Sequence, residues 1–63
     1  MEVENWEIPI GTVVEIINKD SRFFGRKGTK GANDDWGIGC NIWFEDGTFD
    51  CFCWDEFLPV QTN

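Results

Sequence analysis

Residues 38–54 read IGCNIWFEDGTFDCFCW, two runs of strand-forming residues on either side of the dipeptide Asp46-Gly47. Asp-Gly between such runs is the preferred sequence of a two-residue type I′ turn. The stretch therefore predicts a β-hairpin whose strands cover residues 38–45 and 48–54. We expect the rest of the fold to be built around this hairpin.

The expected two-residue loop fixes which residues of the hairpin face each other, and it places Trp43 opposite Asp50. Successive side chains of a strand point to opposite faces, so this register divides the hairpin into two faces. One face is wholly apolar and is expected to form the core: Cys40, Ile42, Phe44, Phe49, Cys51 and Cys53. The other face is mixed, and we expect it to bind a partner through Trp43, Asp50, Phe52 and Trp54. The alternative is that residues 1–9 fold back and cover this face, with Trp6 stacked on it.

Shorter segments outside the hairpin are expected to complete a sheet. Residues 11–18 are rich in β-branched side chains and predict a strand whose buried face carries Val14 and Ile16. Residues 29–33 predict a weak strand, because a glycine lies in the middle of it. A brief closing strand is expected at residues 60–61.

The two ends of the chain have different expected roles. Asp55 is suited to cap a single helical turn, which Pro59 prevents from continuing. Residues 1–9 are interpreted as an acidic arm held by Trp6, so that the domain proper covers residues 10–61. The sequence thus predicts an all-β barrel of about five strands, with one short helical turn before the last strand.

This order of elements resembles that of SH3-like small barrels. Residues 14–17 followed by residues 24–29 resemble the KOW motif of ribosomal proteins and NusG-type transcription factors. Residues 42–47 followed by residues 57–60 are similar to the central hairpin and closing turn of Tudor domains, and also to the photosystem I subunit PsaE. The resemblance implies a small barrel that binds other molecules and rarely catalyses.

Positive charge is confined to one short window of the chain. All five cationic side chains lie between residues 19 and 30, together with only one of the twelve carboxylates. We expect a basic loop that contacts phosphates or an acidic protein patch through Arg22, Phe23, Arg26, Lys27 and Lys30. The alternative is a solvated loop whose charges offset an acidic body, because the chain as a whole carries a net charge of −7.

The composition argues against catalysis and against a metal or other cofactor. Histidine, the commonest general base and metal ligand, is missing from the sequence. Three cysteines are a poor ligand set for zinc, and we expect them to be inert core thiols. Cys40 and Cys53 are expected to face each other at a Cα separation of about 4.5 Å, the short end of disulfide geometry. The opening residues do not resemble a secretory signal, so a cytoplasmic location is expected.

These observations favour a small acidic, non-enzymatic protein-interaction module. Its partner is expected to be a protein with a cationic or apolar patch, and no association with a membrane is expected. One alternative is a KOW-like module that associates with nucleic acid or the ribosome. Another is an acidic inhibitor, of the type that phages make, whose carboxylates mimic nucleic acid.

Overall fold

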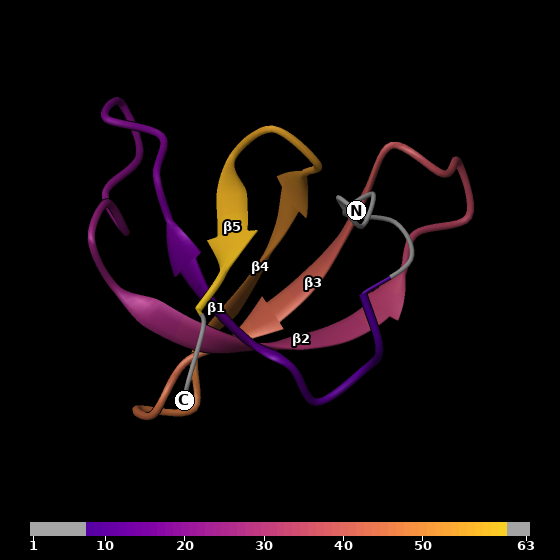
Figure 1. The fold of residues 1–63 in the computed structure, drawn as a ribbon, viewed down its shortest axis with the longest axis horizontal. Coiled ribbons are helices and arrows are strands. Elements are labelled where there is room, and N and C mark those ends of the chain that lie inside the picture. Colours follow the sequence, from indigo (N-terminus) through magenta and orange to yellow (C-terminus); the bar gives the residue numbers. More distant parts are fainter. Residues whose placement is uncertain (1–7, 61–63) are drawn as a thin grey trace.

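The computed structural model describes residues 8–60, which form one antiparallel sheet (Figure 1). Its five strands are β1 (Val13–Ile16), β2 (Lys27–Asn33), β3 (Gly39–Trp43), β4 (Phe49–Cys53) and β5 (Phe57–Pro59). They lie in the order β4-β3-β2-β1-β5. The predicted all-β class and strand number are confirmed, and the arrangement is consistent with a small SH3-like barrel. Within residues 8–60, no helix is long and apolar enough to span a membrane.

Strand β2 is the longest strand, at seven residues, although its sequence KGTKGAN contains few strand-forming side chains. It pairs with β1 on one side and β3 on the other, so pairing outweighs its weak intrinsic preference. Its two glycines lie where there is little room for a side chain, with the tighter contacts at Gly28. A Cβ at Gly28 would lie 2.6 Å from Cγ2 of Ile42, and one at Gly31 would lie 3.2 Å from the indole of Trp43. Strand β2 begins two residues before the weak strand predicted at residues 29–33.

The two outer strands of the sheet, β4 and β5, are joined by residues 54–56 only. This connection is a turn in which the amide of Glu56 donates to the carbonyl of Cys53 at 3.0 Å. The expected helical turn is not found in the described part of the chain. The predicted position of the closing strand, residues 60–61, is also wrong: β5 ends at Pro59, and Gln61 lies outside the described residues.

The core lies on one side of this bent sheet and is rich in aromatic rings. Val14 and Ile16 of β1 are completely buried, as their alternation predicts. The buried hydrophobic residues are Ile8, Val14, Ile16, Phe23, Cys40, Ile42, Phe44, Phe52 and Phe57. Ile8 belongs to the expected N-terminal arm, whereas residues 1–7, with Trp6, lie outside the described residues.

The hairpin between β3 and β4 has a different turn from the predicted type I′ turn. The amide of Phe44 donates to the carbonyl of Thr48 at 2.8 Å, and the amide of Gly47 donates to the carbonyl of Phe44 at 3.0 Å. Gly47 has a φ of 85°, and Asp46 does not have a positive φ. This is the pattern of a three-residue loop, a type I turn followed by a glycine in the left-handed region. Glu45 therefore belongs to the loop.

The three-residue loop shifts the strand pairing by one residue. Trp43 faces Phe49 rather than Asp50, and Cys40 faces Phe52 rather than Cys53. Because side chains alternate along a strand, the shift moves every side chain of β4 to the face opposite the predicted one. The expected core face is correct for the residues of β3 and wrong for those of β4. Phe52 is buried, and the exposed side chains are Phe49, Cys51 and Cys53.

Candidate functional site

The four residues predicted to form a partner-binding surface do not lie together. Trp43 is on the outer face of the sheet, and 46% of its surface is exposed. Phe52 is 4% exposed and belongs to the core. Asp50 faces the buried Ile42, so it lies on the opposite side of the sheet from Trp43. Trp54 lies in the turn after β4 and packs against the core, so the predicted surface is corrected to Trp43 alone.

The outer face carries a different aromatic pair. Trp43 stacks on Phe49 with ring centroids 4.2 Å apart and planes inclined by 28°. The alternation of backbone hydrogen bonds from the Phe44–Thr48 pair makes Trp43 and Phe49 a non-hydrogen-bonded pair. In such pairs the side chains approach most closely, which favours the stack.

This pair lies at one end of a row of paired residues that continues across two further strands, β2 and β1. Val13 on β1 pairs with Thr29 on β2, which in turn pairs with Trp43 on β3. Val13 and Phe49, at the two ends of the row, are 43% and 53% exposed. We call these four residues, Val13, Thr29, Trp43 and Phe49, the outer aromatic face.

The indole of Trp43 is held in place from two sides. Phe49 stacks on it, and Gly31 on the neighbouring strand leaves the space that the indole occupies. A Cβ at residue 31 would lie 3.2 Å from both Cδ1 and Nε1 of the indole. A side chain at residue 31 would therefore require the indole to shift slightly away from the sheet.

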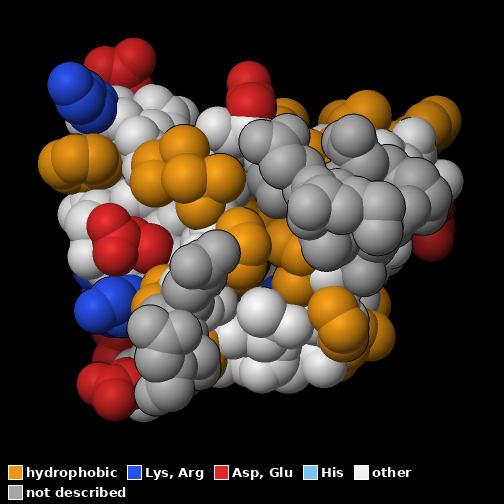
Figure 2. Space-filling model, viewed as in Figure 1, with side chains coloured by type: hydrophobic (Ala, Val, Ile, Leu, Met, Phe, Trp, Pro, Cys, Tyr) orange, Lys and Arg blue, Asp and Glu red, His pale blue; other side chains and the backbone are white. Residues whose placement is uncertain are grey.

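A shallow groove of about 640 Å³ lies over the outer aromatic face and is lined by three of its residues, Val13, Thr29 and Trp43. Arg26 and Lys27 line it where β2 begins, Trp43 lines it from the end of β3, and Glu45 lines it from the β3–β4 loop. The groove thus combines two cations, an aromatic ring and a carboxylate. Figure 2 shows Lys and Arg side chains at the left of one face of the molecule, on the side where Figure 1 places the loop between β1 and β2.

Two members of the predicted basic loop are buried. Phe23 is 5% exposed and stacks on Phe44, with centroids 4.6 Å apart and planes inclined by 4°. Lys30 is 2% exposed, and its Nζ donates to Oδ1 of Asn33 at 2.7 Å and to the carbonyl oxygen of Gly31 at 3.2 Å. The expectation that Phe23 and Lys30 present themselves to a ligand from a loop is therefore wrong.

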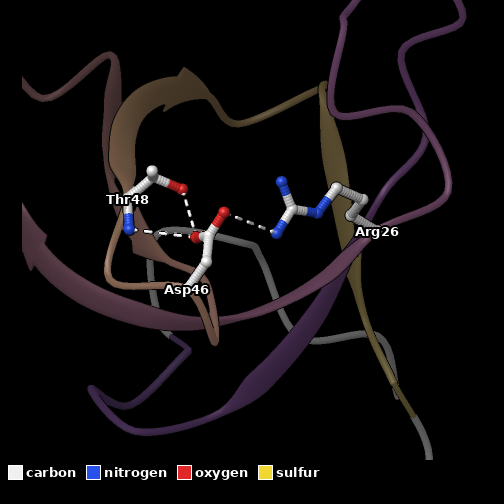
Figure 3. A network of polar contacts seen from close by, with 3 residues as sticks. All are labelled: Arg26, Asp46 and Thr48. Atoms are coloured by element: carbon white, nitrogen blue, oxygen red, sulfur yellow. Dashed lines mark hydrogen bonds and ion pairs between the residues drawn. The ribbon is translucent and has the colours of Figure 1, made fainter.

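The two arginines of this segment lie over the buried rings. The guanidinium carbon of Arg22 is 4.8 Å from the centroid of Phe23, and that of Arg26 is 4.7 Å from the centroid of Phe44. Arg26 also forms an ion pair with Asp46 at 3.5 Å (Figure 3). These contacts connect the loop between β1 and β2 to the β3–β4 turn. Arg22, Arg26 and Lys27 remain exposed.

The cysteines do not form an activated nucleophile or a disulfide. All three are free, and Cys40 and Cys53 are not opposite each other in the observed register. Burial raises the pKa of the Cys40 thiol. Partial desolvation, followed by the nearby Asp34 carboxylate at 3.9 Å from Sγ, raises the pKa of the Cys51 thiol. Both shifts disfavour the reactive thiolate. Among residues 8–60, no three side chains of metal-ligating type are grouped together.

Sequence reasoning missed Phe49 and Val13 as surface residues. The signal for Phe49 was present, because Glu45 before Asp46-Gly47 also fits a three-residue hairpin loop. Sequence reasoning also did not single out Trp36, which is 85% exposed in the turn between β2 and β3.

Comparison with known proteins does not identify a family for this chain. Neither the known protein-family models nor the sequences of curated proteins match this chain.

Proposed function

We propose that the protein is a small non-enzymatic module of the cytoplasm that binds a partner protein through its outer aromatic face. The observation that supports this function is the exposed stack of Trp43 on Phe49 beside a groove. Small domains seldom expose neighbouring large apolar side chains, and those that do so commonly use them for binding. Tryptophan is also among the residues that contribute most to interface energy.

The groove indicates the chemistry of the partner. An apolar side chain or a Lys or Arg side chain would fit against the indole of Trp43, where Glu45 adds a complementary charge. A cation over an indole contributes about 0.5–2 kcal/mol. The other side of the groove, with Arg26 and Lys27, suits an acidic group of the same partner.

A second candidate function is supported by the same groove. Two cations beside an exposed indole also suit a phosphate with an adjacent nucleobase, as in KOW-like association with nucleic acid. The burial of Phe23 and Lys30 removes two residues that this function would use. The acidic inhibitor is supported by the net charge of −7 alone.

We predict that Trp43→Ala weakens partner binding by about 2 kcal/mol or more and leaves the protein folded, because interface energy concentrates in a few aromatic anchors. The partner is first identified by capture on the wild-type protein, and its affinity is then measured by calorimetry. Circular dichroism and urea unfolding of the same samples report the fold. Trp36→Ala is the matched control, since it removes an exposed indole from the β2–β3 turn.

The comparison of the two variants decides where the partner binds. Equal affinities of wild type and Trp43→Ala would contradict the proposed site, and a loss confined to Trp36→Ala would move the site to the turn. Affinity that falls steeply with added salt, or a captured nucleic acid, would favour the second candidate function.

A further inference from the structure

In the sheet formed by residues 8–60, strand β4 lies at one edge, and one side of it has no partner strand among these residues. The observed register directs the amide and carbonyl groups of Phe49, Cys51 and Cys53 away from β3. Such groups form a template for another extended segment unless side chains cover them. In β4, two of the three outward amides are covered by carboxylates.

The two carboxylates that cover these amides differ in how firmly the fold holds them in place. The Cys53 amide donates to Oε2 of Glu56 at 2.8 Å, and Oε1 of Glu56 accepts from the Asn18 side chain at 2.7 Å. Glu56 thus ties the edge to the loop after β1. The Cys51 amide donates at 2.8 Å to Oδ1 of Asp50, the residue directly before it. Asp50 is exposed, so rotation of this one side chain uncovers the amide.

We propose that the edge of β4 from Phe49 to Cys51 accepts an extended segment of a partner protein that carries a Lys or Arg side chain between two apolar residues. This inference rests on the proposed function, and it states how the partner reaches the outer aromatic face. The segment adds to the sheet as a further strand, and Glu56 ends the pairing at Cys53.

The alternation of side chains specifies the sequence pattern of the segment. On an added strand, every second side chain lies on the outer face beside Phe49 and Cys51, which favours apolar residues there. The side chain between them lies on the side of Asp50, where a cation is complementary to the carboxylate. Asp50 then moves from the Cys51 amide to the cation, and the amide donates to a carbonyl of the segment. The net charge of the chain, −7, favours a basic segment over a second copy.

The test is an NMR titration of the full-length ¹⁵N-labelled protein with the capped peptide Val-Lys-Val-Lys-Val. We expect saturable shifts of the Phe49 and Cys51 amides, and no such shifts with Val-Glu-Val-Glu-Val. Asp50→Asn should weaken binding of the lysine peptide by about fivefold, the effect of one partly exposed ion pair. Asp35→Asn, which neutralises an exposed carboxylate in the β2–β3 turn, is the matched control and should leave the affinity unchanged.

Three results would overturn the edge site. These are a lysine peptide that does not bind at millimolar concentration, equal binding of the two peptides, and undiminished binding of a lysine peptide with N-methylated backbone amides. Lysine-peptide shifts confined to Trp43 would also overturn it while supporting the proposed function. Saturable edge shifts, combined with a partner affinity that Trp43→Ala does not change, would support the edge and contradict the outer aromatic face.

Discussion

At the scale of single residues, Asp46 joins two segments that are far apart in the chain. Its Oδ1 accepts hydrogen bonds from the amide of Thr48 at 3.1 Å and from the Thr48 hydroxyl at 2.6 Å. Its other oxygen forms the ion pair with Arg26 at 3.5 Å. The Thr48 bonds, with a smaller contribution from Arg26, hold the pKa of the Asp46 carboxyl below its ordinary value of 3.8. All of these contacts favour the ionised form.

A lowered pKa in the folded state predicts a pH-dependent effect of Asp46→Ala. The ionised carboxylate stabilises the fold above its ordinary pKa, and this stabilisation is lost as the pH falls through the lowered folded-state pKa. We therefore expect the variant to unfold at lower urea concentration than wild type at pH 7, and the difference to shrink towards pH 3. Thr48→Ala, which removes one of the two donors, should show a smaller pH-dependent difference. A difference that does not change with pH would contradict this role.

At the scale of elements, the β3–β4 hairpin shows how one loop residue decides a whole strand. With a two-residue loop, Phe49, Cys51 and Cys53 would be in the core. With the observed three-residue loop they are exposed, and Phe52 takes the core position. The same shift creates the Trp43–Phe49 stack and places Cys51 on the same face as Trp43, with Asp50 on the opposite face. Both proposals of function therefore depend on the register.

Thiol alkylation measures this register directly. We predict that iodoacetamide modifies Cys51 and Cys53 in the native protein and modifies Cys40 only after denaturant is added, because Cys40 alone is buried. The rate at Cys51 should rise as the pH increases, since its raised pKa leaves little thiolate at pH 7. Mass spectrometry of peptide fragments identifies each site. Native protection of Cys51 and Cys53 would instead indicate the register of the two-residue loop.

At the scale of the whole molecule, the loop between β1 and β2 completes the core of a chain of 63 residues. Phe23 stacks on Phe44 and meets Phe52 edge-on, with centroids 5.7 Å apart. Such small domains bury little surface and depend on each large side chain. The residue that a sequence reading places on a ligand-binding loop therefore stabilises the fold.

Adjacent phenylalanines provide a test of this role. We expect Phe23→Ala to lower the free energy of unfolding by about 3–5 kcal/mol, through lost burial and the cavity left behind. Phe24→Ala should change it by less than about 0.5 kcal/mol, because Phe24 is on the surface and 52% exposed. Urea unfolding of both variants gives the comparison. An equal or larger loss for Phe24→Ala would show that Phe23 does not hold the loop to the core.

Features that depend on local pattern could be predicted from the sequence. The β-branched run of β1 predicted a strand with Val14 and Ile16 buried, and strand-forming runs around Asp46-Gly47 predicted a hairpin in an all-β fold. The sequence also confined the cations to residues 19–30. These properties follow from side-chain alternation and turn preference, which act over a few residues.

The faces of β4 and the surroundings of Phe23 and Lys30 depend instead on contacts between distant parts of the chain. Two hairpin loops fit the same Glu-Asp-Gly sequence, and packing of Phe52 against Phe23 and Phe44 accompanies one of them. Lys30 is buried on the side of the sheet that carries its pairing partner Ile42, and the Asn33 side chain, beyond an irregularity in β2, accepts a hydrogen bond from its ammonium group. Such contacts join residues through the pairing of distant strands, so no local pattern contains them.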